Sequence, residues 1–273
     1  MNPKRRSEES TLAAGIAIVA SLWLLSFAGS ALWPDALHRH CPLGADVLRP
    51  DRTVCELAFG GLWISLSIGL AAGALATAFG LAVAVAARSL GGWPDAGLMR
   101  FADALFALPD VLVLMVLQFA AQTLGDLNPG LRFNPVLLMV ISLALIAWAA
   151  PARLFRNRLA TLGRQDFVIA AKALGSGPGH LFIAHFWPTL RAYGWAIFLA
   201  RVPAAILAES TVSFLGIGRV EPMSLGRYLG TSYGSLIYRS GSRVVLPAWG
   251  LLVLIVLGAS LASRGAAALA DRP

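Results

Sequence analysis

The chain has 273 residues and too few charges to cover the surface of a water-soluble protein of that size. Hydrophobic residues make up 58% of it and charged residues 13%, whereas soluble domains have roughly 45–50% and about 25%. This composition excludes an ordinary cytosolic enzyme and a disordered chain, and it predicts an all-α membrane protein. The net charge of +8 is typical of basic cytoplasmic loops, so we expect no nucleic-acid partner.

Six stretches are apolar enough to cross a bilayer as helices, which takes about 20 residues each. They cover residues 12–32, 57–87, 101–121, 135–150, 193–215 and 244–261. The predicted organisation is a cytoplasmic N-terminus (1–11), a first transmembrane helix (12–32), an external segment (33–56), a core transmembrane domain (57–263) with a cytoplasmic loop (153–190), and a cytoplasmic C-terminus (264–273).

The distribution of Lys and Arg determines the predicted orientation. Basic residues are more frequent in the segments that a cytoplasmic N-terminus would place inside, and they are densest in residues 153–172. Cytoplasmic loops carry such an excess. We therefore expect both termini in the cytoplasm. Cys41 and Cys55 then lie in an external segment, where a disulfide would be stable, although two free thiols fit the sequence equally well.

The polar stretch 153–190 has the pattern of two short helices joined by a sharp turn. Small and apolar residues recur at helical spacing along one face of the first helix: Phe167, Ala170, Ala171 and Leu174. Asp166 lies in its first turn, where a carboxylate favours the helix dipole. Gly175 is the expected C-terminal cap because it tolerates positive φ. Pro178 suits the start of the second helix, which we expect to end or kink at Pro188.

Two interpretations of this loop remain open from the residues alone. It is either an interfacial helix pair packed on its own bundle or a docking element for a cytoplasmic partner. Ala170 and Ala171 are small enough to let a partner approach closely, and Phe167, Leu174 and Phe182 offer apolar contacts. The chain has no P-loop of the form GxxxxGK[ST], so it would not bind ATP through that motif.

Charged residues inside the predicted spans are candidates for a translocation path, because a charge in a bilayer is costly and usually functional. Asp103 and Asp110 are seven residues apart on one predicted helical face, and Arg201, Glu209 and Ser210 follow in the fifth span. We expect Arg201 to pair with Asp103. The alternative is that these charges form structural ion pairs or snorkel to the interface.

Two glycine patterns lead to different expectations. Gly69 and Gly73 form GxxxG, which predicts close helix packing, against a partner either in this chain or in another subunit.

Gly230, Ser232 and Gly234 fit GxSxG, but no His follows and no strand precedes them, as a hydrolase would need. We therefore expect no catalytic residues, and we expect residues 219–243 to form an outer loop or a re-entrant stretch.

The loop and several separate segments carry motifs of a known family. Residues 166–190 read DFVIAAKALGSGPGHLFIAHFWPTL, and further motifs are CPLGAD from Cys41, GGWPD from Gly91, FALP from Phe106 and ESTVSFLGIG from Glu209. The first resembles the EAA loop of ABC-transporter permeases, and the whole set resembles the second permease of dipeptide, oligopeptide and nickel importers. The resemblance covers residues 41–271. The chain departs from the family at Ile169, where the EAA motif has Glu, and Asp166 lies one turn earlier.

The resemblance implies a type I importer permease with about six spans in the inner membrane of a bacterium. It implies a second, homologous permease, two ATPase subunits and an extracytoplasmic solute-binding protein as partners. ATP and Mg would be bound by the ATPase subunits, and no cofactor or metal by this chain. The residues expected at the ATPase contact are Asp166, Phe167, Ile169, Ala170, Ala171, Leu174, Gly175, Phe182 and Pro188.

The ligand that the resemblance favours is a short peptide, with nickel chelates, opines and peptide-like antibiotics as alternatives within the family. The competing class is a secondary transporter driven by an ion gradient, which would have ion ligands at broken helices near the midplane. An intramembrane enzyme would need a catalytic set within the spans, and the sequence offers none.

Overall fold

The computed structural model describes residues 3–28, 41–43, 52–128, 134–218, 223–234 and 241–270. Every regular element within these ranges is a helix. Five helices are long and apolar enough to cross a membrane, and a sixth span results if a helix pair bent by 45° counts as one. The prediction of an all-α membrane protein with about six spans is confirmed. The end of the predicted first span and most of segment 33–56 lie outside the described residues.

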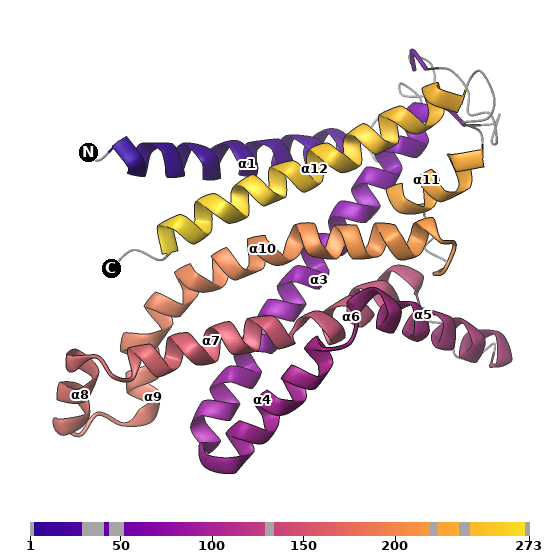
Figure 1. The fold of residues 1–273 in the computed structure, drawn as a ribbon. Coiled ribbons are helices and arrows are strands. Elements are labelled where there is room, and N and C mark those ends of the chain that lie inside the picture. Colours follow the sequence, from indigo (N-terminus) through magenta and orange to yellow (C-terminus); the bar gives the residue numbers. More distant parts are fainter. Residues whose placement is uncertain are drawn as a thin grey trace.

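The N-terminal and C-terminal helices form one edge of the bundle. α1 (Pro3–Phe27) lies along α12 (Gly241–Ala270), and both chain ends lie near the same end of the molecule (Figure 1). Glycines make this pairing close: a Cβ at Gly15 would overlap the backbone of Ala262, and one at Gly265 would overlap Leu12. Small residues let helix backbones approach in this way inside membranes.

The long helix α3 (Val54–Leu90) crosses α10 (Trp187–Phe214) at the centre of the bundle (Figure 1). Gly69 faces the side chain of Ile206, and Gly73 faces Val202. The close packing predicted from GxxxG is confirmed, and its partner is a helix of this chain. α3 begins with a capping box, in which Thr53 and Glu56 satisfy each other's backbone N–H groups.

The predicted third span is broken into two helices. α4 (Gly92–Phe106) ends before Pro109, and α5 (Asp110–Leu127) begins after it. Proline disfavours helical backbone in the residue before it and lacks the N–H that a continuous helix needs. The expectation that Asp103 and Asp110 share one helical face is therefore wrong, because they lie on different helices.

A second break separates α6 (Pro135–Ala147) from α7 (Ala149–Leu162), which together form the bent pair. Beyond α7 come α8 (Asp166–Ala173) and α9 (Pro178–Leu181), which project from one end of the bundle (Figure 1).

The second loop helix does not end at Pro188. A π-helical turn (Phe182–Phe186) joins α9 to α10, and Pro188 lies in the first turn of α10. A π turn accommodates the missing N–H of a proline without stopping the helix. Of the two alternatives predicted for Pro188, an end of the helix is wrong, and the helix is instead distorted by the π turn just before this residue.

One buried helix was not predicted. α11 (Leu225–Ser232) lies within the stretch expected to be an outer loop or a re-entrant stretch, and it packs against α3, α10 and α12. Gly226 contacts the backbone of Ser210, and Gly230 contacts that of Phe214, so α11 and α10 touch backbone to backbone. Ser232 lies in this helix and does not follow a strand, which agrees with the absence of a hydrolase elbow here.

A disulfide joins Cys41 to Cys55 near the start of α3. The sequence left this pairing open, and the structure decides it in favour of the disulfide.

Candidate functional site

The short helix α8 exposes its apolar residues. Phe167 is 46% exposed, Ile169 54% and Leu174, the residue just after the helix, 88%, whereas Val168 is fully buried. Asp166 and Ala170 are also exposed, and the other predicted contact residue, Ala171, is half-buried. An exposed apolar patch at the end of a bundle is typical of a surface that another protein covers.

The turn after α8 is a Schellman motif. The N–H of Ser176 bonds the carbonyl of Ala171 (3.1 Å), and that of Gly175 bonds the carbonyl of Lys172 (3.0 Å). Gly175 has φ of +82°, a conformation that other L-residues adopt only at a cost. Gly177 then caps α9, with Pro178 as its first residue. The glycine turn predicted between the two helices is confirmed.

Both ends of the loop are attached firmly to the bundle. α7 passes into α8 through backbone bonds from Arg164 to Thr161 (3.2 Å) and from Gln165 to Leu162 (3.1 Å). On the other side the π turn continues into α10, and its Phe182 packs against the buried cluster that contains Phe155. A displacement of α8 would therefore be carried into α7 and α10. Phe182 faces its own bundle and anchors the loop.

The five charged or polar candidates from the spans lie in three separate places. Asp103, on α4, forms an ion pair with Arg153 of α7, and both side chains are more than one third exposed. Arg153 also lies over the ring of Phe106, 5.2 Å from its centroid. The expectation that Asp103 pairs with Arg201 is wrong, since Arg153 takes this role.

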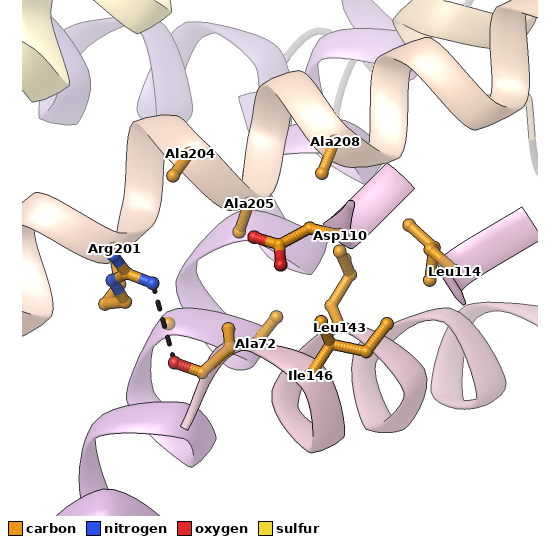
Figure 2. Close-up of a pocket in the computed structure, with 11 residues that line it drawn as sticks. Ala72, Asp110, Leu114, Leu143, Ile146, Arg201, Ala204, Ala205 and Ala208 are labelled. Atoms are coloured by element: carbon orange, nitrogen blue, oxygen red, sulfur yellow. Dashed lines mark hydrogen bonds between the residues drawn. The ribbon is translucent and has the colours of Figure 1, made fainter. Parts of the chain in front are cut away.

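Asp110 and Arg201 instead line a small cavity between α3, α5, α6 and α10. Its volume is about 40 Å³, and Figure 2 shows the two charged groups pointing into it. Arg201 donates a hydrogen bond of 3.5 Å to the carbonyl of Ala147, the last residue of α6. A cation is stabilised at a helix C-terminus and an acid at a helix N-terminus, because each suits the local dipole. The end of α6 therefore stabilises Arg201, and the start of α5 stabilises Asp110.

Glu209 and Ser210 belong to a buried hydroxyl cluster elsewhere on α10. The Glu209 carboxyl is fully buried and accepts hydrogen bonds from Ser213 (2.7 Å), Ser65 (3.0 Å) and Ser210 (3.3 Å). The Ser65 hydroxyl in turn accepts from the backbone N–H of Leu225 (3.1 Å). One carboxyl thus connects α3, α10 and the start of α11.

An ion pair that the sequence did not reveal joins the start of α4 to α7. Arg156 donates to both carboxylate oxygens of Asp95, at 2.6 Å each. This bond, together with the charge of Arg88, holds the pKa of Asp95 below its ordinary value of 3.8, against the opposite effect of burial. The two residues are 61 positions apart, and nothing in the local pattern links them.

Replacing Asp95 by Asn is expected to destabilise the protein by about 1 kcal/mol at pH 7, because a bidentate charge-assisted pair is lost from a partly exposed site. Because the pKa of Asp95 is lower in the folded protein than in the unfolded chain, the ion pair stabilises the fold fully above the unfolded-state pKa. This stabilisation disappears as the pH falls through the folded-state pKa. The difference between wild type and variant should thus shrink below pH 4. Thermal unfolding in detergent across pH measures it. Asp103→Asn, on the same helix pair but more exposed, is the control with a smaller effect, and equal losses would contradict this account.

Comparisons with known proteins agree with this architecture. The family described as "Binding-protein-dependent transport system inner membrane component" matches residues 76–272. A protein of Brucella ovis, provisionally named a peptide permease, is 30% identical over 81% of this chain and 70% of its own length. The oligopeptide transport system permease protein OppC of Haemophilus influenzae is 29% identical, covering 77% of this chain and 61% of that protein. OppC of Bacillus subtilis is 28% identical, covering 75% and 63%.

The family match spans most of the chain, from the second half of α3 to the end of α12, and it includes the α8–α9 loop. The chain therefore belongs to the family of inner membrane components of binding-protein-dependent transport systems, as a multi-pass permease subunit of an ABC importer and not an enzyme.

Proposed function

We propose that this chain forms half of the translocation pathway for short peptides and that its α8–α9 loop couples the pathway to an ATPase. The peptide ligand is supported by the names of the relatives, which are peptide and oligopeptide permeases. The partners in this proposal are a second, homologous permease, two ATPase subunits that bind ATP and Mg, and an extracytoplasmic binding protein.

The observation that carries the coupling role is the exposed apolar surface of α8, held on a rigid loop. Phe167, Ile169 and Leu174 are open to a partner, while Phe182 and the π turn before Pro188 fix the loop to α10. A short helix fixed to two long helices transmits rigid-body motion of a docked partner. Ile169 makes the contact more apolar than the Glu of the family motif would, and Asp166 provides a nearby carboxylate.

The orientation proposed from the basic residues is supported by the arrangement of the bundle. Both chain ends lie toward the end that carries α8 and α9, and α11 lies toward the other end (Figure 1). The Cys41–Cys55 disulfide is near the start of α3, and disulfides persist in oxidising compartments outside the cytoplasm. These features favour cytoplasmic termini and a cytoplasmic α8–α9 loop.

Asp110 and Arg201 are the strongest candidates for lining the path. They carry opposite charges into a cavity between α3, α5, α6 and α10, which belong to the candidate membrane spans, and charged residues within spans are functional by default. Asp103 lies with Arg153 outside this cavity. Glu209 joins α10 to α3 through Ser65, and Ser210 bonds Glu209 within α10. We therefore assign the path to the first pair and structural roles to the others.

Asp110→Asn is expected to lower peptide uptake about tenfold, because a lost charge-assisted contact of about 1.5 kcal/mol corresponds to that factor. Uptake of a labelled peptide into proteoliposomes that contain the whole complex measures the effect. Asp126→Asn, near the far end of the same helix α5, is the control. Unchanged uptake by the Asp110 variant would remove it from the path.

Purification of the chain from its native membrane in mild detergent, followed by mass spectrometry, tests the assembly. Stoichiometric P-loop ATPases and a second permease support the proposal, and a chain that drives uptake alone from an ion gradient contradicts it. Competition between peptides, nickel chelates and opines for uptake by the complex then decides the ligand class. An Ile169→Glu variant shows whether this position sets the strength of the ATPase contact.

A further inference from the structure

A groove that the coupling role does not explain lies between the α8–α9 loop and the end of α3. Its volume is about 480 Å³. Its lining residues come from α3, α7, α8, α9 and the π turn, and they include Arg88, Ser89, Leu159, Lys172, Phe182 and Phe186. The space is large enough for part of a small molecule or a lipid, because a single water needs only about 10–15 Å³.

The groove is amphipathic and carries only positive charge. Phe182, Phe186 and Leu159 form apolar walls that are continuous with a buried cluster of the bundle. Arg88 and Lys172 contribute two cations, and no acidic residue is among those that line it. Neither cation forms an ion pair within the described part of the chain. The charge of Arg88 acts on Asp95, but both carboxylate oxygens of Asp95 are already bound to Arg156.

The position of Lys172 separates this groove from the surface proposed for the ATPase. Lys172 follows the buried Val168 by one helical turn, so both lie on the side of α8 that faces the bundle. Phe167, Ile169 and Leu174 are exposed and remain available to a protein docked from the cytoplasm. The groove opens beside helices at the cytoplasmic end of the bundle, where lipid headgroups lie in the orientation proposed above.

We propose that this groove binds an anionic phospholipid of the cytoplasmic leaflet, with its phosphate between Arg88 and Lys172 and an acyl chain along Phe182 and Phe186. Basic pockets between helices on the cytoplasmic side are suited to acidic lipid headgroups, and the apolar walls suit a chain better than a free anion. The bound lipid fills the space between the loop and α3. The inference rests on the proposed cytoplasmic placement of the loop, but not on the ligand that is transported.

The experiment uses the purified importer complex and counts bound lipids by native mass spectrometry during titration with phosphatidylglycerol or phosphatidylcholine. The wild-type complex should retain phosphatidylglycerol in preference to phosphatidylcholine. A double variant, Arg88→Gln with Lys172→Gln, should need about thirtyfold more phosphatidylglycerol for the same occupancy, since each cation near a headgroup contributes about 1 kcal/mol, or about fivefold. Ser89→Trp keeps both cations and fills the groove, and it should lower retention as well.

The matched control removes two other exposed basic residues that do not line the groove, Arg100→Gln with Arg264→Gln. Equal retention of phosphatidylglycerol by this control and by the Arg88/Lys172 variant would overturn the proposal, as would equal retention of the two lipids by wild type. Loss of the ATPase subunits from the Arg88/Lys172 variant with lipid retention unchanged would also overturn it, because the cations would then serve the protein partner. Failure of coupling is detected separately, by ATP hydrolysis and uptake.

Discussion

Gly175→Val is expected to uncouple ATP hydrolysis from uptake while the chain still inserts and assembles. Gly175 has φ of +82°, where a residue with a Cβ costs about 1–2 kcal/mol and a β-branched residue more. A cost of about 2 kcal/mol would reduce the population of the native turn about thirtyfold if the turn is marginally stable. The isolated α8 is too short to be stable by itself, so it depends on this turn for its position.

The measurement is ligand-stimulated ATP hydrolysis together with peptide uptake, in proteoliposomes that contain the full complex. The expected result is a several-fold loss of uptake, with subunit yield and basal hydrolysis close to wild type. Gly179→Val is the matched control, because Gly179 lies in the same loop and also has open space around it, but its φ is not positive. Gly175→Asn should recover much of the function, since Asn tolerates this conformation. Normal coupling by Gly175→Val would exclude the turn from the coupling path.

Glu209→Ala is expected to destabilise the bundle strongly. The substitution leaves the hydroxyls of Ser65, Ser210 and Ser213 without their acceptor in a fully buried site. The bond from Ser65 joins two helices, and a buried bond of this kind contributes about 0.6–1.7 kcal/mol. The hydroxyls of Ser210 and Ser213, on the same helix as Glu209, are left buried without this acceptor, which adds an unsatisfied-group penalty. The expected loss is about 2–4 kcal/mol, with α11 the first helix to detach.

Unfolding in a graded mixture of mild and denaturing detergent, monitored by tryptophan fluorescence, measures this loss. Ser210→Ala removes only one long bond within α10, at 3.3 Å, and should cost about 1 kcal/mol or less. Glu209→Gln keeps the volume and one acceptor oxygen, so an intermediate effect is expected. If Glu209→Ala abolishes uptake at unchanged stability, the residue lines the path and the structural role is wrong.

Local signals in the sequence were sufficient for the class, the approximate number of spans and the glycine turn after α8. Apolar stretches of about 20 residues identify spanning helices because the bilayer imposes that length. Gly175 and Pro178 predicted the end of one helix and the start of the next because their backbone preferences act within a few residues. The π turn before Pro188 was missed, since whether a proline stops or merely distorts a helix depends on what packs around it.

Contacts between distant segments were decided only by the tertiary structure. The sequence identified Asp103, Asp110, Arg201 and Glu209 as charges in spans. The partner of Asp103, the carbonyl bound by Arg201 and one hydroxyl bound to Glu209 lie on other helices. Pro109 breaks the third span and separates Asp103 from Asp110, so that Arg201 shares a cavity with Asp110.

The dependence on contacts between distant segments also explains why the sequence did not predict α11 or the Asp95–Arg156 pair. α11 is short and weakly apolar, and its burial follows from Gly226 and Gly230 packing on α10. The ion pair between Asp95 and Arg156 joins residues that are 61 positions apart in the sequence. Periodicity and capping report which conformation a segment prefers, because those effects act along the chain. Which charges meet is determined by how the helices cross, and that depends on side-chain packing throughout the bundle.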